Sequence, residues 1–122
     1  LHCNWPDSMP LSKGSARLLG QAIENILRNA LRFTPPGASV WLSISRSEEY
    51  WILQIRDSGP GVAEAYLPRL FTPFFRVPGA ELSGSGYGLG LALAKRLTEA
   101  AGGSISAANC TPGLCISLKL PG

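Results

Sequence analysis

Apolar and polar residues follow one another along residues 13–33 with the spacing of an amphipathic helix. Viewed down a helix that turns about 100° per residue, one side is apolar and the opposite side is polar. The apolar side consists of Leu19, Ile23, Ile26, Leu27 and Ala30, and the polar side of Gln21, Asn25, Arg28, Asn29 and Arg32. The sequence "TPPG" then predicts the end of the helix, because a proline restricts the residue before it to extended conformations.

Two pairs of short apolar segments have the alternation and spacing of β-hairpins. Residues 39–45, "SVWLSIS", and residues 50–56, "YWILQIR", are joined by the polar "RSEE". Residues 104–109, "SISAAN", and residues 114–121, "LCISLKLP", flank the turn sequence "CTPG". Each pair therefore predicts an antiparallel hairpin.

A loop and a second helix are predicted between the two hairpins. Residues 57–86 have glycines at both ends and prolines throughout, which indicates a loop with at most one or two short helices. Residues 87–103, "YGLGLALAKRLTEAAGG", combine apolar residues at helical spacing with glycines at both ends. They predict a second amphipathic helix.

Length and charge narrow the classes of function. The 122 residues predict one domain over 1–122, with an irregular opening over residues 1–10. The formal net charge is +3, but the basic residues form no run, which argues against a nucleic-acid partner. No apolar run approaches the roughly 20 residues that span a bilayer. The chain begins with Leu1 rather than methionine, so we expect a piece of a longer protein.

The three cysteines do not indicate a metal site. Cys3, Cys110 and Cys115 lack the spacing of zinc ligands, and their number is odd, unlike that of a disulfide framework. We interpret them as reduced thiols of a cytosolic protein.

Asn25 and Asn29 are unusual in a helix interior. Asparagine destabilises that position because its side chain competes for backbone hydrogen bonds. The two residues lie four positions apart and therefore share the polar face of the predicted helix. This placement indicates a role other than helix stability.

Two further features are compatible with ligand binding. Asp57 follows a predicted strand and precedes "SGPG", so it is either an Asx-turn or cap residue or a ligand-binding carboxylate beside a turn. Residues 84–95, "GSGYGLGLALAK", place a glycine-rich loop directly before a helix, where backbone N–H groups and the helix dipole attract phosphate. Neither a Walker lysine nor a Rossmann context accompanies this loop.

Taken in chain order, four segments resemble the ATP-binding catalytic domain of sensor histidine kinases. "ENILRNALRFTP" resembles the N box, "DSGPGV" the G1 box, "LFTPFFR" the F box and "GYGLGL" the G2 box. The resemblance covers roughly residues 11–121. It implies a two-layer α/β sandwich, in which helices cover one face of a mixed, mostly antiparallel sheet.

The resemblance also implies roles for the polar face of the first helix. Asn29 would coordinate Mg²⁺ that bridges the nucleotide phosphates, and Asn25 would lie beside it. One amide oxygen plus phosphates and waters suits the hard oxygen ligands that magnesium prefers. Arg32 would contact a phosphate, and the less favoured alternative is a solvated surface arginine.

The other boxes would bind the base and the phosphates of ATP. By the resemblance, Asp57 accepts the adenine amino group, and Gly59 and Gly61 shape the pocket floor. A short lid would span about residues 76–85. The G2 residues that would line the phosphates are Gly86, Tyr87, Gly88, Leu89 and Gly90.

The F box would form the base of the lid, and the sequence departs from the family pattern at two positions that bear on lid packing and adenine contacts. Phe71, Phe74 and Phe75 would anchor its base, and Arg76 would approach the terminal phosphate. Tyr87 replaces the small residue that is usual in the G2 box, and Leu114 replaces a frequent threonine.

The residue at position 25 helps to predict whether the chain hydrolyses ATP or transfers its phosphoryl group. Gyrase-type and mismatch-repair ATPases of this fold have a glutamate base four residues before the magnesium asparagine. Asn25 occupies that position, and an amide cannot accept a proton at neutral pH. We therefore expect weak hydrolysis and phosphoryl transfer to a side chain from elsewhere.

The acceptor implied by the resemblance is a histidine on a separate helical dimerisation domain of the parent protein. His2, the single histidine, has no adjacent acidic residue, and we expect it to be incidental. A response regulator would act downstream. The isolated chain would be a monomer with ATP and ADP as ligands, in the cytoplasmic part of a membrane-bound sensor. Two alternatives are a serine kinase of the anti-sigma-factor type and a non-catalytic nucleotide-sensing module.

Overall fold

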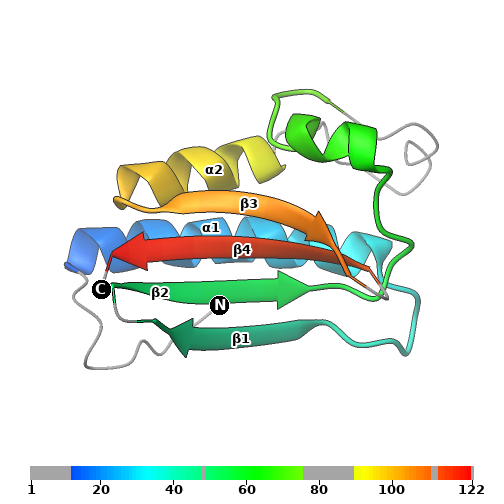
Figure 1. Ribbon diagram of the computed structural model, residues 1–122, viewed down its shortest axis with the longest axis horizontal. Coiled ribbons are helices and arrows are strands. Elements are labelled where there is room, and N and C mark those ends of the chain that lie inside the picture. Colours follow the sequence, from blue (N-terminus) through cyan, green and yellow to red (C-terminus); the bar gives the residue numbers. More distant parts are fainter. Residues whose placement is uncertain (1–11, 48, 76–89, 111–112, 122) are drawn as a thin grey trace.

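The computed structural model describes residues 12–47, 49–75, 90–110 and 113–121 as a sheet covered on one face by helices (Figure 1). The helical elements are α1 (Lys13–Phe33), the 3-10 helix η1 (Glu64–Arg69) and α2 (Gly90–Ala100). The strands are β1 (Trp41–Arg46), β2 (Tyr50–Arg56), β3 (Ser104–Asn109) and β4 (Leu114–Pro121). The predicted two-layer α/β sandwich is confirmed.

The four strands are ordered β1-β2-β4-β3, and every neighbouring pair is antiparallel. The sheet is therefore not mixed in its described strands, which corrects one detail of the expectation. The cause is the position of β4. Because β2 and β3 both run antiparallel to β4, they point the same way, but β4 lies between them and keeps them from pairing.

Helix α1 has the bounds that its apolar spacing predicts. Its N-cap, Ser12, accepts a hydrogen bond at Oγ from the Ser15 N–H at 3.0 Å. The backbone N–H of Thr34, the C-cap, donates to the Ala30 carbonyl at 3.0 Å. The predicted apolar side is buried, except that Leu27 is half-buried.

The core lies between the helices and the inward face of β2 and β4. The register pairs Leu53 with Leu118 and Ile55 with Ile116, and all four side chains are buried. In α2, the buried Thr98 satisfies its hydroxyl by donating to the Ala94 carbonyl at 2.7 Å. Burial of each apolar side chain in β2 and β4 stabilises the folded state by about 1.5–3 kcal/mol relative to exposure.

The edge strand β1 is less buried than its alternating sequence suggests. Leu42 and Ile44 face the same side as the buried Ile55 and Leu53, yet they are 50% and 38% exposed. Alternation identifies the face of a strand but not its place in the sheet, and an edge strand has a neighbour on one side only. In the described residues, no helix is long and apolar enough to cross a membrane.

Candidate functional site

Five elements meet at one end of the sheet, where the candidate site lies. β2 and β3 end there, β4 begins there, α1 ends beside them, and α2 begins at the same end (Figure 1). The segments that carry the predicted site residues are thus far apart in sequence but close in space. The N-terminus of the 11-residue α2 adds backbone N–H groups at this end.

Asp57 lies at the end of β2 and is almost fully buried, with 4% of its surface exposed. Its Oδ1 accepts hydrogen bonds from the Gly59 N–H at 2.9 Å and the Leu114 N–H at 3.0 Å. The bond to Gly59 is an Asx-turn, so the structural interpretation of this aspartate is correct. Because Oδ1 accepts both backbone hydrogen bonds, the other carboxylate oxygen, Oδ2, is available to a ligand.

Gly113 makes room for Asp57. Its φ is +91°, and a Cβ added there would lie 1.9 Å from the Asp57 carbonyl oxygen. No other residue fits without displacing the backbone of the site. Gly113 had no predicted role in the site, although the "TPG" of the predicted turn was a usable signal.

Asn109 holds the segment after Asp57 against the end of β3. Its Oδ1 accepts from the Val62 N–H at 2.8 Å, and its Nδ2 donates to the Val62 carbonyl. The same Oδ1 lies 2.9 Å from the position that a Cβ on Gly61 would occupy, and Gly61 has φ +76°. Gly61 therefore permits the close approach of Asn109, a residue that was not predicted from the sequence.

Ser58 joins the Asp57 turn to the end of α1. Its backbone N–H donates to Thr34 Oγ1 at 3.2 Å, and its hydroxyl donates to the Ser39 carbonyl. Thr34 is the C-cap of α1, the helix that carries the two asparagines. A direct hydrogen bond thus connects the segment that carries the asparagines with the segment that carries the Asp57 carboxylate.

The predicted residues of α1 differ in their surroundings. Asn25 is half-buried, and its Nδ2 donates to the Gln21 carbonyl of its own helix at 3.2 Å. Asn29 is also half-buried, and no side-chain hydrogen bond to it occurs within the described ranges. Arg32 is exposed. The side-chain amide of Asn29 is therefore the better placed of the two to receive a ligand.

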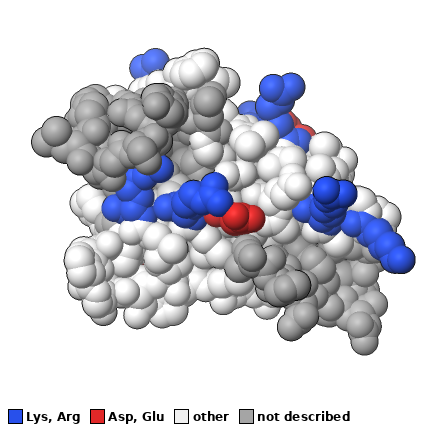
Figure 2. Space-filling model, turned by 180° about the vertical axis from the view of Figure 1, so that it is seen from behind, with Lys and Arg blue, Asp and Glu red and all other residues white. Residues whose placement is uncertain are grey.

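Glu24 takes part in a surface ion pair. Its Oε1 pairs with Arg28 Nη2 at 2.6 Å, and both side chains are largely exposed. A surface pair of this kind stabilises a helix by about 0.3–0.5 kcal/mol. On the helix-covered side of the molecule, basic side chains stand at several separate places (Figure 2).

The three phenylalanines of the F box differ in burial. Phe71 and Phe75 pack half-buried against the core, and the Phe75 ring lies 5.8 Å from that of Tyr66. Phe74 is 71% exposed with φ +65°, so the expectation that it packs against the body is wrong. Its left-handed backbone directs the side chain to solvent in the short turn after η1, which explains why neighbouring phenylalanines differ.

Part of the predicted site lies outside the described residues. This applies to the proposed lid over 76–85 and to the positions Arg76, Gly86, Tyr87, Gly88 and Leu89. Gly90 is described, and it is the exposed first residue of α2. The structure therefore brings together the end of α1, the Asp57 turn and the start of α2.

The chain is similar to known proteins in sequence and in fold. Residues 14–122 match the family model described as "Histidine kinase-, DNA gyrase B-, and HSP90-like ATPase". The chain is 48% identical to the sensor protein PfeS of Pseudomonas aeruginosa over 84% of its own length and 23% of that protein. It is 42% identical to the sensor protein TorS of Escherichia coli over 94% of its length and 12% of that protein. The chain thus spans less than a quarter of either relative.

Solved structures show the same similarity. A mycobacterial sensor histidine kinase, MprB, superposes with a TM-score of 0.80 at 33% identity, over 88% of this chain and 74% of that one. Full-length ShkA in complex with AMPPNP gives a TM-score of 0.69 at 29% identity, over 88% of this chain and 21% of that one. The chain therefore belongs to the histidine kinase-, DNA gyrase B- and HSP90-like ATPase family, as an ATP-binding domain of the sensor histidine kinase type.

Proposed function

We propose that this chain binds Mg-ATP and donates its γ-phosphoryl group to a histidine on a separate helical dimerisation domain of the parent protein. The observation that carries the proposal is the buried Asp57 carboxylate, held by the Gly59 and Leu114 N–H groups at the end of the sheet where α1 ends and α2 begins. ShkA, whose structure contains AMPPNP, shares this fold. ADP would be the product that leaves the site.

Asp57 would recognise adenine through its second carboxylate oxygen. Oδ1 is already occupied by two backbone donors, so the carboxylate cannot rotate freely and Oδ2 has a fixed direction. A fixed acceptor selects the amino group of adenine, whereas guanine has a carbonyl at that position. Gly59 and Gly61 would allow the backbone to approach the base closely.

The residues fit a magnesium ion that is held mainly by the nucleotide. Among the described residues, no cluster of three or more histidine, cysteine or acidic side chains could hold a metal ion by itself. The half-buried Asn29 amide can supply one hard oxygen ligand, and magnesium commonly takes the rest from phosphates and waters. When bound, the ion would neutralise charge that develops on the phosphates.

The chain's own residues favour transfer over hydrolysis. Asn25 is not a base, and Glu24 is paired with Arg28 at the surface. The phosphates would be bound and oriented by the α2 N-terminus, Arg32 and the G2 residues. Because these groups only position the phosphates, the acceptor of the phosphoryl group must come from elsewhere. Such a transfer suits a place in the cytoplasmic part of a sensor, with a response regulator acting downstream.

A pair of variants at Asp57 tests this proposal. Asp57→Asn retains an oxygen for the Gly59 and Leu114 donors but places an amide donor toward the base, whereas Asp57→Ala removes both acceptors. We expect ATP affinity, measured by calorimetry with Mg²⁺, to fall about 10- to 150-fold in both variants. Only Asp57→Ala should also lose substantial stability.

GTP and magnesium provide the controls. The parent chain should bind GTP much more weakly than ATP, and omission of Mg²⁺ should weaken ATP binding in the parent chain but much less in Asn29→Ala. Equal affinities for ATP and GTP would remove Asp57 from base recognition. An unchanged magnesium dependence in Asn29→Ala would remove Asn29 from the metal site.

A further inference from the structure

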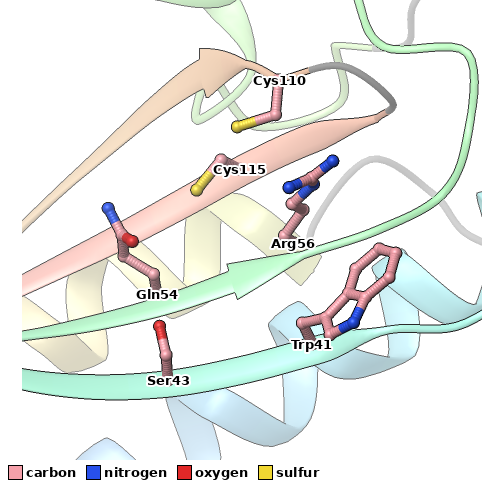
Figure 3. A pocket seen from close by; sticks show the side chains of 6 residues that line it. All are labelled: Trp41, Ser43, Gln54, Arg56, Cys110 and Cys115. Carbon is pink, nitrogen blue, oxygen red and sulfur yellow. The ribbon is translucent and has the colours of Figure 1, made fainter.

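Cys110 and Cys115 form a pair on the face of the sheet opposite the helices. Cys110 follows β3 and Cys115 is the second residue of β4, so both belong to the same hairpin. The Cys110 side chain points toward Cys115 (Figure 3), and Cys110 is close enough to affect the ionisation of Cys115. They line a shallow hollow together with Trp41, Ser43, Gln54 and Arg56.

The two thiols differ in exposure. Cys115 is 8% exposed, whereas Cys110 is half-buried and opens onto the hollow. Burial, and then the neighbouring Cys110 side chain, raise the pKa of the Cys115 thiol, and the nearby Arg56 charge opposes this rise. Cys115 therefore remains a protonated thiol at neutral pH, and Cys110 is the thiol that a small solute meets first.

We propose that Cys110 and Cys115 form a redox-active dithiol site, which a peroxide oxidises to an intramolecular disulfide. The Cys110 thiolate attacks the peroxide, the O–O bond breaks, and a sulfenic acid and water form. The Cys115 sulfur then attacks the Cys110 sulfur, the S–O bond breaks, and the hydroxide leaves as water with the thiol proton. In sum, two thiols are oxidised and one hydrogen peroxide is reduced to two waters.

Formation of the disulfide requires movement of the hairpin backbone. The register pairs Cys115 with Ala108, and Cys110 lies beyond that pair, so the cysteines are diagonal rather than direct neighbours. Diagonal residues on one face of a hairpin are about 7–8 Å apart, whereas a disulfide needs Cα atoms about 4.4–6.8 Å apart. The hairpin must therefore tighten, and a strained disulfide of this kind is readily reduced again.

This movement displaces groups of the nucleotide site. This part of the inference rests on the function proposed above. Between the two cysteines, Gly113 packs against the Asp57 backbone and Leu114 donates its N–H to Asp57 Oδ1. The Cys110 N–H also donates to the Gly113 carbonyl at 2.9 Å. Tightening the hairpin displaces these groups, so the oxidised chain should bind ATP more weakly than the reduced chain.

The first test is chemical and does not depend on nucleotide binding. Cys3→Ser leaves Cys110 and Cys115 as the two thiols of the chain. After treatment with hydrogen peroxide, we expect mass spectrometry to show a monomer that has lost two hydrogen atoms. Thiol titration should then detect neither free thiol, and dithiothreitol should restore both. Cys110→Ser and Cys115→Ala in this background should each fail to lose hydrogen. Surviving thiols, or oxidation only to sulfinic acids or to dimers, would overturn the proposal.

The second test measures ATP affinity in the same preparations. Oxidation of Cys3→Ser should weaken ATP binding about threefold to tenfold, reversibly, since one charge-assisted hydrogen bond is distorted. The additional Cys110→Ser variant should bind ATP equally before and after peroxide. A complete disulfide with unchanged affinity would refute the coupling and leave the proposed function intact. A reduced chain that does not bind ATP would instead refute the proposed function.

Discussion

Gly113 shows how one residue can matter to both fold and site. It combines φ +91° with backbone contact to Asp57, whereas Gly102 has φ +90° and open space around the position that a Cβ would take. Gly102→Ala should therefore cost about 1 kcal/mol for backbone strain alone. Gly113→Ala should cost at least about 2 kcal/mol, because the methyl group also displaces Asp57.

Chemical denaturation of both glycine variants measures this difference, and ATP titration adds a second readout. Gly102→Ala should bind ATP as the parent chain does, whereas Gly113→Ala should bind it more weakly. If the two variants lost the same stability and both bound ATP normally, the contact between Gly113 and Asp57 would have no energetic importance.

Asn109 is exposed, but its substitution should reduce stability more than is usual for an exposed residue. Asn109→Ala removes both hydrogen bonds to Val62, and Asn109→Asp retains the acceptor for the Val62 N–H but loses the donor. We expect a loss of about 1 kcal/mol per hydrogen bond, with Asp intermediate between Asn and Ala. Amide hydrogen exchange at Val62 should accelerate in Asn109→Ala, and unchanged exchange there would contradict the role of Asn109 in holding this segment.

At the scale of elements, α1 and both hairpins follow from the sequence because their signals are local. The bounds of α1 depend on apolar spacing within the helix and on the prolines after it, all within a few turns. The position of β4 between β2 and β3 has no comparable signal, since it depends on pairing between residues far apart in the chain, such as Trp51 and Leu120. The expectation of a mixed sheet went wrong for this reason.

The contact between α1 and the Asp57 turn gives a prediction at the same scale. Thr34→Val retains the shape of the side chain but removes the oxygen that accepts from the Ser58 N–H. We expect ATP affinity to fall while the helix content, measured by circular dichroism, stays unchanged. Thr34→Ser keeps the oxygen and is the matched control. Loss of affinity in Thr34→Ser but not in Thr34→Val would show that the methyl group, rather than the hydrogen bond, positions the turn.

At the scale of the whole molecule, the candidate site was predictable in part. Asp57, Asn25 and Asn29 occur in motifs that can be read from adjacent residues, and the structure brings the end of α1, the helix with both asparagines, beside the end of β2. Asn109 could not be found in this way, because its partner Val62 is 47 residues distant and the asparagine looks like an ordinary strand end. Side-chain contacts between distant loops require the fold.

The last prediction separates a transferase from a self-sufficient ATPase. Since Asn25 bonds to its own helix and Glu24 is paired with Arg28, the described part of α1 offers no base to activate water. The chain alone, incubated with radiolabelled ATP and Mg²⁺, should therefore release little phosphate and remain unlabelled. Addition of the histidine-bearing helical domain of the parent protein should label that domain in an acid-labile, base-stable form. Label on a serine of a partner protein would favour the anti-sigma-factor type of kinase, and rapid phosphate release by the chain alone would contradict the argument from Asn25.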